Sequence, residues 1–78
     1  MKKTTTELIF EYIKENYKYS DGSDNREHTT DDWIAQDLDI PMNVVHRLTR
    51  KLEDDGRIDG DDFFGWTVRE DLKIVENP

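Results

Sequence analysis

The sequence predicts a small α+β domain in which three helices are followed by a β-hairpin. Apolar residues recur at helical spacing in three separate segments before residue 56, and at alternating spacing in one segment after residue 60. The chain has 78 residues, of which 33% are hydrophobic, so it can build only one thin core. We therefore expect residues 1–78 to form a single domain.

The first helix is expected from Thr5 to Tyr17. Its inward stripe consists of Leu8, Ile9, Tyr12 and Ile13. Thr4 or Thr5 can cap its N-terminus by accepting a hydrogen bond from a free backbone N–H. A run of turn-forming residues follows, and we expect residues 21–28 to form a flexible surface loop.

The second and third helices are separated by a tight turn. Thr29–Asp32 opens the second helix, because a threonine cap followed by two acids suits the positive end of the helix dipole. This helix ends near Asp39, since Pro41 keeps the residue before it out of the helical conformation. The third helix is expected from Met42 to Asp55 and stops at Gly56. Its inward residues are Val45, Leu48 and Leu52.

Two short strands form the expected hairpin. Arg57–Asp59 is the first strand, Gly60–Asp62 the turn and Phe63–Arg69 the second strand. Alternation assigns three side chains of the second strand to the core: Phe64, Trp66 and Val68. Phe63 points the other way and is an interface candidate. The tail at 71–78 is expected to form either a third strand or an extended segment.

A short helix, a tight turn and a longer helix form a helix-turn-helix, and the hairpin stands where a wing would follow. Residues 29–40 resemble the second helix and turn of winged helix-turn-helix proteins, and residues 45–58 resemble their recognition helix and the entry to the wing. The pattern Leu52-Glu53-x-x-Gly56-x-Ile58 is the most specific part. The resemblance is to the superfamily, closest to the DNA-binding part of MarR-like regulators. It implies that the third helix enters a major groove and that the wing touches the backbone or minor groove.

The outward side of the third helix carries residues that suit duplex DNA. Opposite the aliphatic stripe lie Asn43, Arg47 and Arg50. Arginine can grip guanine with two hydrogen bonds, and asparagine can do the same for adenine. His46 and Lys51, on the flanks, are better placed for phosphates. We therefore expect a small DNA-binding transcriptional regulator rather than an enzyme, and a homodimer would double these contacts.

Charge argues against ordinary wing contact and keeps a second function open. The chain has 19 acids and 11 bases, a net charge of −8. Residues 41–53 carry +2, whereas residues 54–62 carry −4, which would repel phosphates. The alternative is an acidic protein-binding module, or a phage-type inhibitor that imitates nucleic acid on a basic nucleic-acid-binding protein. Its contact residues would be Asp31, Asp32, Asp59, Asp61, Asp62 and Phe63. Adaptation to high salt would also explain the acidity.

Other classes find little support in the sequence. There is no cysteine, which excludes disulfide scaffolds and cysteine-ligated zinc. His28 and His46 are too far apart in sequence for a zinc motif, and no phosphate-binding loop is present. We expect no cofactor, metal or catalytic site. No apolar run approaches the roughly 20 residues that span a bilayer, and the N-terminus lacks a signal-peptide pattern, so we expect a cytoplasmic protein without membrane contact.

Overall fold

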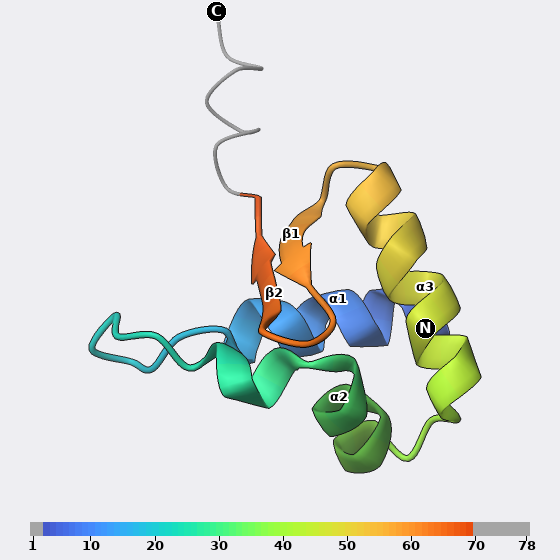
Figure 1. The fold of residues 1–78 in the computed structure, drawn as a ribbon, viewed down its shortest axis with the longest axis horizontal. Coiled ribbons are helices and arrows are strands. Elements are labelled where there is room, and N and C mark those ends of the chain that lie inside the picture. The colour runs from blue at the N-terminus through green and yellow to red at the C-terminus, as the bar shows by residue number, and fades with distance from the viewer. Residues whose placement is uncertain (1–2, 70–78) are drawn as a thin grey trace, which may run out of the picture.

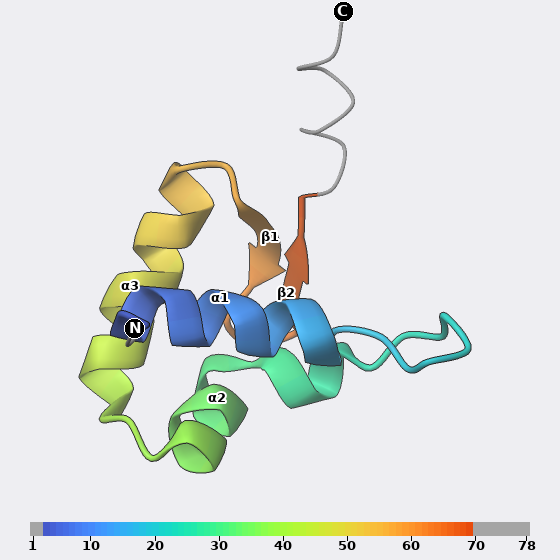
Figure 2. The ribbon, with the colours of Figure 1, turned by 180° about the vertical axis from the view of Figure 1, so that it is seen from behind.

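A computed structural model describes residues 3–69 of the chain. Three α-helices precede a two-stranded antiparallel hairpin, which confirms the predicted α+β order and gives the layout of a winged helix (Figure 1). The elements are α1 (Thr5–Asn16), a 3-10 helix η1 (Arg26–Thr29), α2 (Asp31–Leu38), α3 (Met42–Asp54), β1 (Ile58–Asp61) and β2 (Gly65–Val68). Seen from behind, α1 crosses in front of α3 and the hairpin (Figure 2). The prediction for the tail at 71–78 lies outside the described residues.

α1 begins with a reciprocal cap and buries a narrow apolar line. The Thr4 hydroxyl accepts a hydrogen bond from the N–H of Glu7 at 3.1 Å, and the Glu7 carboxylate accepts one from the N–H of Thr4 at 2.9 Å. Ile9 and Ile13 are fully buried. The prediction that Leu8 faces inward is wrong, because its side chain is 44% exposed. The buried line is therefore narrower than the predicted stripe.

The connection between α1 and α2 has more structure than the sequence indicated. Lys18 and Asp24 form an isolated β-bridge, and η1 follows. Thr29, at the end of η1, is buried, and its hydroxyl accepts from the N–H of Trp66 at 3.1 Å and donates to the C=O of the same residue at 2.9 Å. The segment that we predicted as a loop over residues 21–28 thus ends in an anchor for β2.

The turn between α2 and α3 matches its prediction closely. Thr30 caps α2 by accepting from the N–H of Trp33 at 3.4 Å. α2 ends at Leu38, and its C-cap residue Asp39 takes the left-handed conformation with φ 57°. Aspartate tolerates this region better than most residues. Pro41 is the N-cap of α3, and Gly56, with φ 78°, follows the end of that helix.

The first strand of the hairpin is longer than predicted and the second is shorter, so the turn lies two residues further along the chain. β1 begins at Ile58 and pairs that residue with Val68, and β2 begins at Gly65. Phe63 and Phe64 therefore lie in the turn, where the alternation of a strand does not apply. The prediction that Phe64 packs in the core is wrong, because its side chain is 67% exposed. We call residues 58–68 the wing.

One small core joins all these elements. The buried hydrophobic residues are Ile9, Ile13, Ile34, Val45, Leu52, Ile58 and Trp66. Leu48 and Val68 pack against this cluster and are half-buried. Each of the three α-helices contributes at least one buried side chain to this cluster. None of the helices within residues 3–69 is long and apolar enough to cross a bilayer.

Candidate nucleic-acid interface

α3 has one packed side and one open side. Val45, Thr49 and Leu52 are buried. Four of the five residues predicted to contact DNA are exposed: Asn43, Arg47, Arg50 and Lys51. The prediction that the three base-reading residues face solvent while the aliphatic residues face inward is therefore confirmed.

The basic groups on this open side are available for contacts with a ligand. Within residues 3–69, neither Arg47 nor Arg50 forms an ion pair with an acidic side chain. Lys51 lies 3.7 Å from the carboxylate of Asp55, one turn further along the chain, and both side chains are more than half exposed. Such an exposed ion pair contributes little to stability, so Lys51 can leave Asp55 for another partner. All three cations can therefore turn toward phosphates or base edges.

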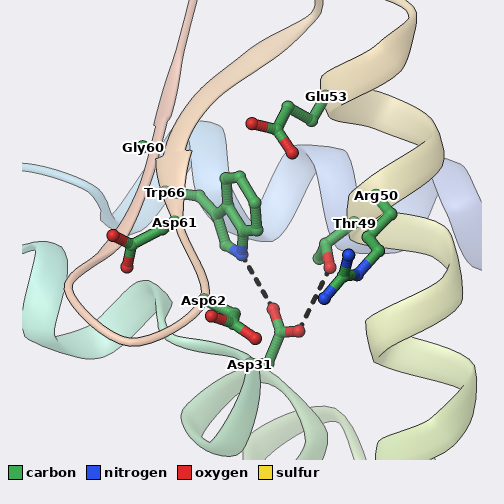
Figure 3. Close-up of a pocket in the computed structure, with 8 residues that line it drawn as sticks. All are labelled: Asp31, Thr49, Arg50, Glu53, Gly60, Asp61, Asp62 and Trp66. Carbon is green, nitrogen blue, oxygen red and sulfur yellow. Dashed lines mark hydrogen bonds between the residues drawn. The ribbon is translucent and has the colours of Figure 1, made fainter.

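An acid-lined hollow of about 190 Å³ lies between α3 and the wing (Figure 3). Arg50 and Glu53 line it from α3, and Asp61 and Asp62 line it from the wing. Asp31 lies at its floor. Arg50 is thus the single base among four carboxylates in this lining. These carboxylates would repel a phosphate placed over the hollow. The part of α3 that a phosphate can approach therefore ends at this hollow.

Two of the wing's exposed acids also shape its backbone. One oxygen of Asp61 accepts the backbone N–H groups of Phe63 at 2.8 Å and Phe64 at 2.7 Å, which closes the turn. Asp59 accepts the N–H of Gly60 at 2.9 Å. These carboxylates are exposed, so they keep their charge toward solvent while they hold the turn.

The wing tip carries two large exposed aromatic side chains. Phe63 is 77% exposed and Phe64 is 67% exposed. Their rings meet edge to face with centroids 5.0 Å apart. The prediction that Phe63 points away from the core is confirmed. The tip therefore combines apolar surface with the negative charge of the neighbouring aspartates.

A buried polar network ties α2 to α3 and the wing. Asp31, in the first turn of α2, is 1% exposed. Its carboxylate accepts hydrogen bonds from Nε1 of Trp66 at 2.7 Å and from the hydroxyl of Thr49 at 3.2 Å (Figure 3). Nδ1 of His46 lies 2.5 Å away. The expectation that Asp31 belongs to a protein-binding surface is wrong, because it is enclosed by these partners. Asp32, Asp59 and Asp61 remain exposed, as expected.

One ring nitrogen of the half-exposed His46 side chain faces the interior of the protein. Nδ1 faces Asp31 and lies 3.8 Å from the carboxylate of Asp62, while the side chain as a whole is 42% exposed. We predicted a free side chain that contacts a phosphate. The structure places Nδ1 of His46 between α3, α2 and the wing, whereas Lys51 is exposed.

The pKa values of Asp24, in the loop after α1, and of Tyr12, in α1, depart from their ordinary values. The backbone N–H of Arg26 lowers the pKa of Asp24. Burial raises the pKa of Tyr12 to about 12, and the carboxylate of Asp37 adds to this effect. Both shifts favour the ionisation state that each group has at neutral pH, so neither group changes charge there.

Sequence reasoning missed the buried polar residues. Thr49 lies four residues after Val45 and three before Leu52, in the middle of the apolar stripe, so its spacing alone indicates burial. A buried hydroxyl then needs a partner. Asp31 and Trp66, in contrast, are 35 residues apart, and no local pattern predicts that they meet.

Comparisons of the chain with protein-family models, with curated proteins and with solved structures found no match.

Proposed function

We propose that the chain binds duplex DNA through the open side of α3. The observation that carries this proposal is that Asn43, Arg47 and Arg50 are exposed on the helix after the tight turn, and that neither guanidinium forms an ion pair within residues 3–69. The helix is anchored by its opposite side, so these groups have a fixed position from which to reach a groove.

The chemistry of these side chains fits direct reading of bases. Arginine donates two parallel hydrogen bonds to O6 and N7 of guanine, and asparagine pairs with adenine in the same way. Lys51, beside them, suits a phosphate that fixes the register. In helix-turn-helix proteins the second helix of the motif lies in the major groove, and the resemblance to the DNA-binding part of MarR-like regulators supports the same placement. Regulation of transcription is the corresponding role.

The acidic wing sets the expected mode of docking. Asp59, Asp61 and Asp62 would meet the sugar-phosphate backbone if the wing lay flat on DNA. We infer that α3 docks while the wing stands off. Binding to arbitrary sequences is then weak, and a second copy on an adjacent half-site would strengthen it.

A salt series on duplex DNA tests the proposal. Replacing both arginines, Arg47→Ala with Arg50→Ala, should weaken binding at least tenfold, whereas Lys51→Ala should reduce the slope of log affinity against log salt by about 1. The matched control, Lys14→Ala with Lys18→Ala, removes the same charge from exposed positions outside α3. It should change the affinity and its salt dependence little. Circular dichroism checks that the variants fold. Absence of binding at low salt, or equal loss in the two double variants, contradicts the proposal.

A second candidate function is binding to a basic protein, and the wing tip is the observation that favours it. Phe63 and Phe64 are exposed beside Asp59 and Asp61, a combination that suits a cationic surface with an apolar pocket. A partner captured by the wild type should be lost with Phe63→Ser and Phe64→Ser and retained with the α3 double variant. Displacement of that partner by duplex DNA would identify its nucleic-acid site as the contact.

A further inference from the structure

Three side chains with metal-ligating atoms converge from three elements. Asp31 comes from α2, His46 from α3 and Asp62 from the turn of the wing, and each offers one ligand atom within 4.8 Å of the other two. Nδ1 of His46 lies 2.5 Å from an oxygen of Asp31 and 3.8 Å from an oxygen of Asp62. A hollow of about 310 Å³, lined by these residues among others, opens beside them. A small ion can therefore reach this point from solvent.

Within residues 3–69, no ion pair with a lysine or arginine balances the charge of this cluster, although Arg50 lines the hollow next to Asp31 and Asp62. Asp31 is 1% exposed, and no lysine or arginine of the described chain pairs with it. Trp66 and Thr49 are neutral donors, and the N-terminus of α2 contributes only a partial positive charge. A buried carboxylate is costly without a nearby cation. Even a protonated His46 would leave Asp31 and Asp62 with a net charge of −1.

We propose that Asp31, His46 and Asp62 bind a divalent transition-metal cation of the Zn²⁺ type. Two carboxylates and one neutral imidazole cancel a charge of +2, and one nitrogen with two oxygens is a donor set that such cations accept. Solvent supplies the remaining coordination. The inference is independent of the DNA-binding function proposed above.

The network around Asp31 already has the form of an outer ligand shell. Metal-bound carboxylates are commonly held in place by further hydrogen bonds. Nε1 of Trp66 donates to one oxygen of Asp31 and the hydroxyl of Thr49 donates to the other. These donors fix the first ligand before an ion arrives.

Small side-chain rotations complete the site. A cation about 2.1 Å from each ligand needs ligand atoms roughly 3 to 3.5 Å apart. The pair Asp31–His46 must open from 2.5 Å and the pair His46–Asp62 must close from 3.8 Å. The side chains of His46 and Asp62 are each 42% exposed. They can rotate when an ion replaces the contact between His46 and Asp31, whereas Asp31 is held by Trp66 and Thr49. The ring proton of His46 then resides on Nε2, which leaves Nδ1 to bind the metal.

A bound cation would fasten the wing to the two helices. Besides the contacts of the Asp31 side chain, one backbone hydrogen bond joins α2 to the turn of the wing, from the N–H of Asp31 to the C=O of Asp62 at 3.3 Å. An ion that binds the folded form and not the unfolded form stabilises it by mass action. At a free concentration one hundred times Kd, the unfolding equilibrium constant falls about 100-fold.

The test uses the full chain without a histidine tag, stripped by a chelator and titrated with Zn²⁺ and Co²⁺. We expect a rise in Tm with Zn²⁺ and visible ligand-field absorption with Co²⁺. His46→Gln and Asp62→Asn should each lose both signals. The matched controls are His28→Gln and Asp61→Asn, which make the same chemical changes outside the cluster and should keep both signals.

Three results would overturn the proposal. The first is a wild type without Co²⁺ absorption and without a Zn²⁺-dependent change in Tm. The second is retention of the signals in His46→Gln, which would place the metal elsewhere. The third is an equal rise in Tm with Mg²⁺, or an equal loss in Asp61→Asn, either of which would indicate general screening of the acidic wing.

Discussion

α3 and the wing lie side by side on one core, yet their outer surfaces have opposite charge. The inner side of α3 contributes Leu52 and the inner side of the wing contributes Trp66, and both are nearly fully buried. On the outside, α3 presents two arginines that form no ion pair within residues 3–69, whereas the wing presents aspartates and an exposed pair of phenylalanines. Two neighbouring elements with the same structural task thus offer different surfaces to a partner.

This difference shows that the inner and outer sides of an element answer to separate demands. Packing and the Asp31 network determine the inner sides, because buried groups must fit and be paired. Among the described residues every buried side-chain polar atom has a hydrogen-bond partner. The outer sides are free of these demands, so their charge can follow function. Four predictions test this comparison, from the largest effect to the smallest.

The largest effect is expected from the core. Leu52→Ala in α3 should lower the free energy of unfolding by about 2–5 kcal/mol, because it leaves a cavity in place of a fully buried side chain. Phe64→Ala at the wing tip should change it by less than about 0.5 kcal/mol, since that ring is exposed. Chemical denaturation measures both. A similar cost for the two variants would mean that the tip is packed and that the contrast between core and tip is wrong.

The start of β2 should be nearly as sensitive. An added Cβ at Gly65 would lie 2.0 Å from the carbonyl oxygen of Arg26, and the residue has φ 107°. Gly65→Ala should therefore cost about 3 kcal/mol or more, from strain and from separation of the wing from η1. Gly22→Ala is the control, because Gly22 also has positive φ but nothing within 4 Å, and it should cost about 1–2 kcal/mol. Equal Tm values for the two variants would contradict the close packing of β2 on η1.

The buried network that joins both elements comes next. Trp66→Phe keeps an aromatic ring in the core but removes the donor to Asp31, and hydrogen bonds to charged groups contribute about 1.5–3 kcal/mol. We expect a loss of stability in that range. Trp33→Phe is the matched control, because Trp33 is 43% exposed, and it should be milder. If Trp66→Phe unfolds at the denaturant concentration of the wild type, the Asp31 carboxylate has another partner.

The smallest effect concerns charge alone. Asp59→Asn with Asp61→Asn keeps both turn-forming acceptors and removes two negative charges from the wing. Each charge at roughly 8 Å from a phosphate costs about 0.5 kcal/mol in water, so DNA affinity at low salt should rise about fivefold. Asp21→Asn with Asp24→Asn, in the distant loop, should leave affinity nearly unchanged. An unchanged affinity in the wing variant would show that the wing lies away from the phosphates altogether.

Local sequence patterns predicted the helices and the turn between α2 and α3. Helix caps, helical spacing, a proline and a glycine act within a few residues of where they stand, so Thr30, Pro41 and Gly56 could be assigned without tertiary information. The open side of α3 followed from the same spacing. In contrast, the network of Asp31, which forms the floor of the candidate site, depends on contacts across 15 and 35 residues, which a local pattern does not contain.

The wrong predictions have a common physical cause. Leu8 and Phe64 are apolar, and the sequence pattern assigned each apolar residue in the period to the core. A core this small has room for few large side chains, so some apolar residues stay outside. Asp31 is the converse case, because an acid was assigned to the surface although it is buried beside two donors, Trp66 and Thr49, and a ring nitrogen of His46. Hydrophobicity alone does not rank residues for so few interior positions.

The hydroxyl of Thr29 has one more consequence. A residue in a strand directs its N–H and its C=O toward the same side, and Thr29 engages both of these groups of Trp66. An unoccupied sheet margin is where a foreign polypeptide can add itself by main-chain pairing, and such addition is a common start of aggregation. The Thr29 side chain therefore occupies two backbone groups on this edge of β2 with which another polypeptide could otherwise pair.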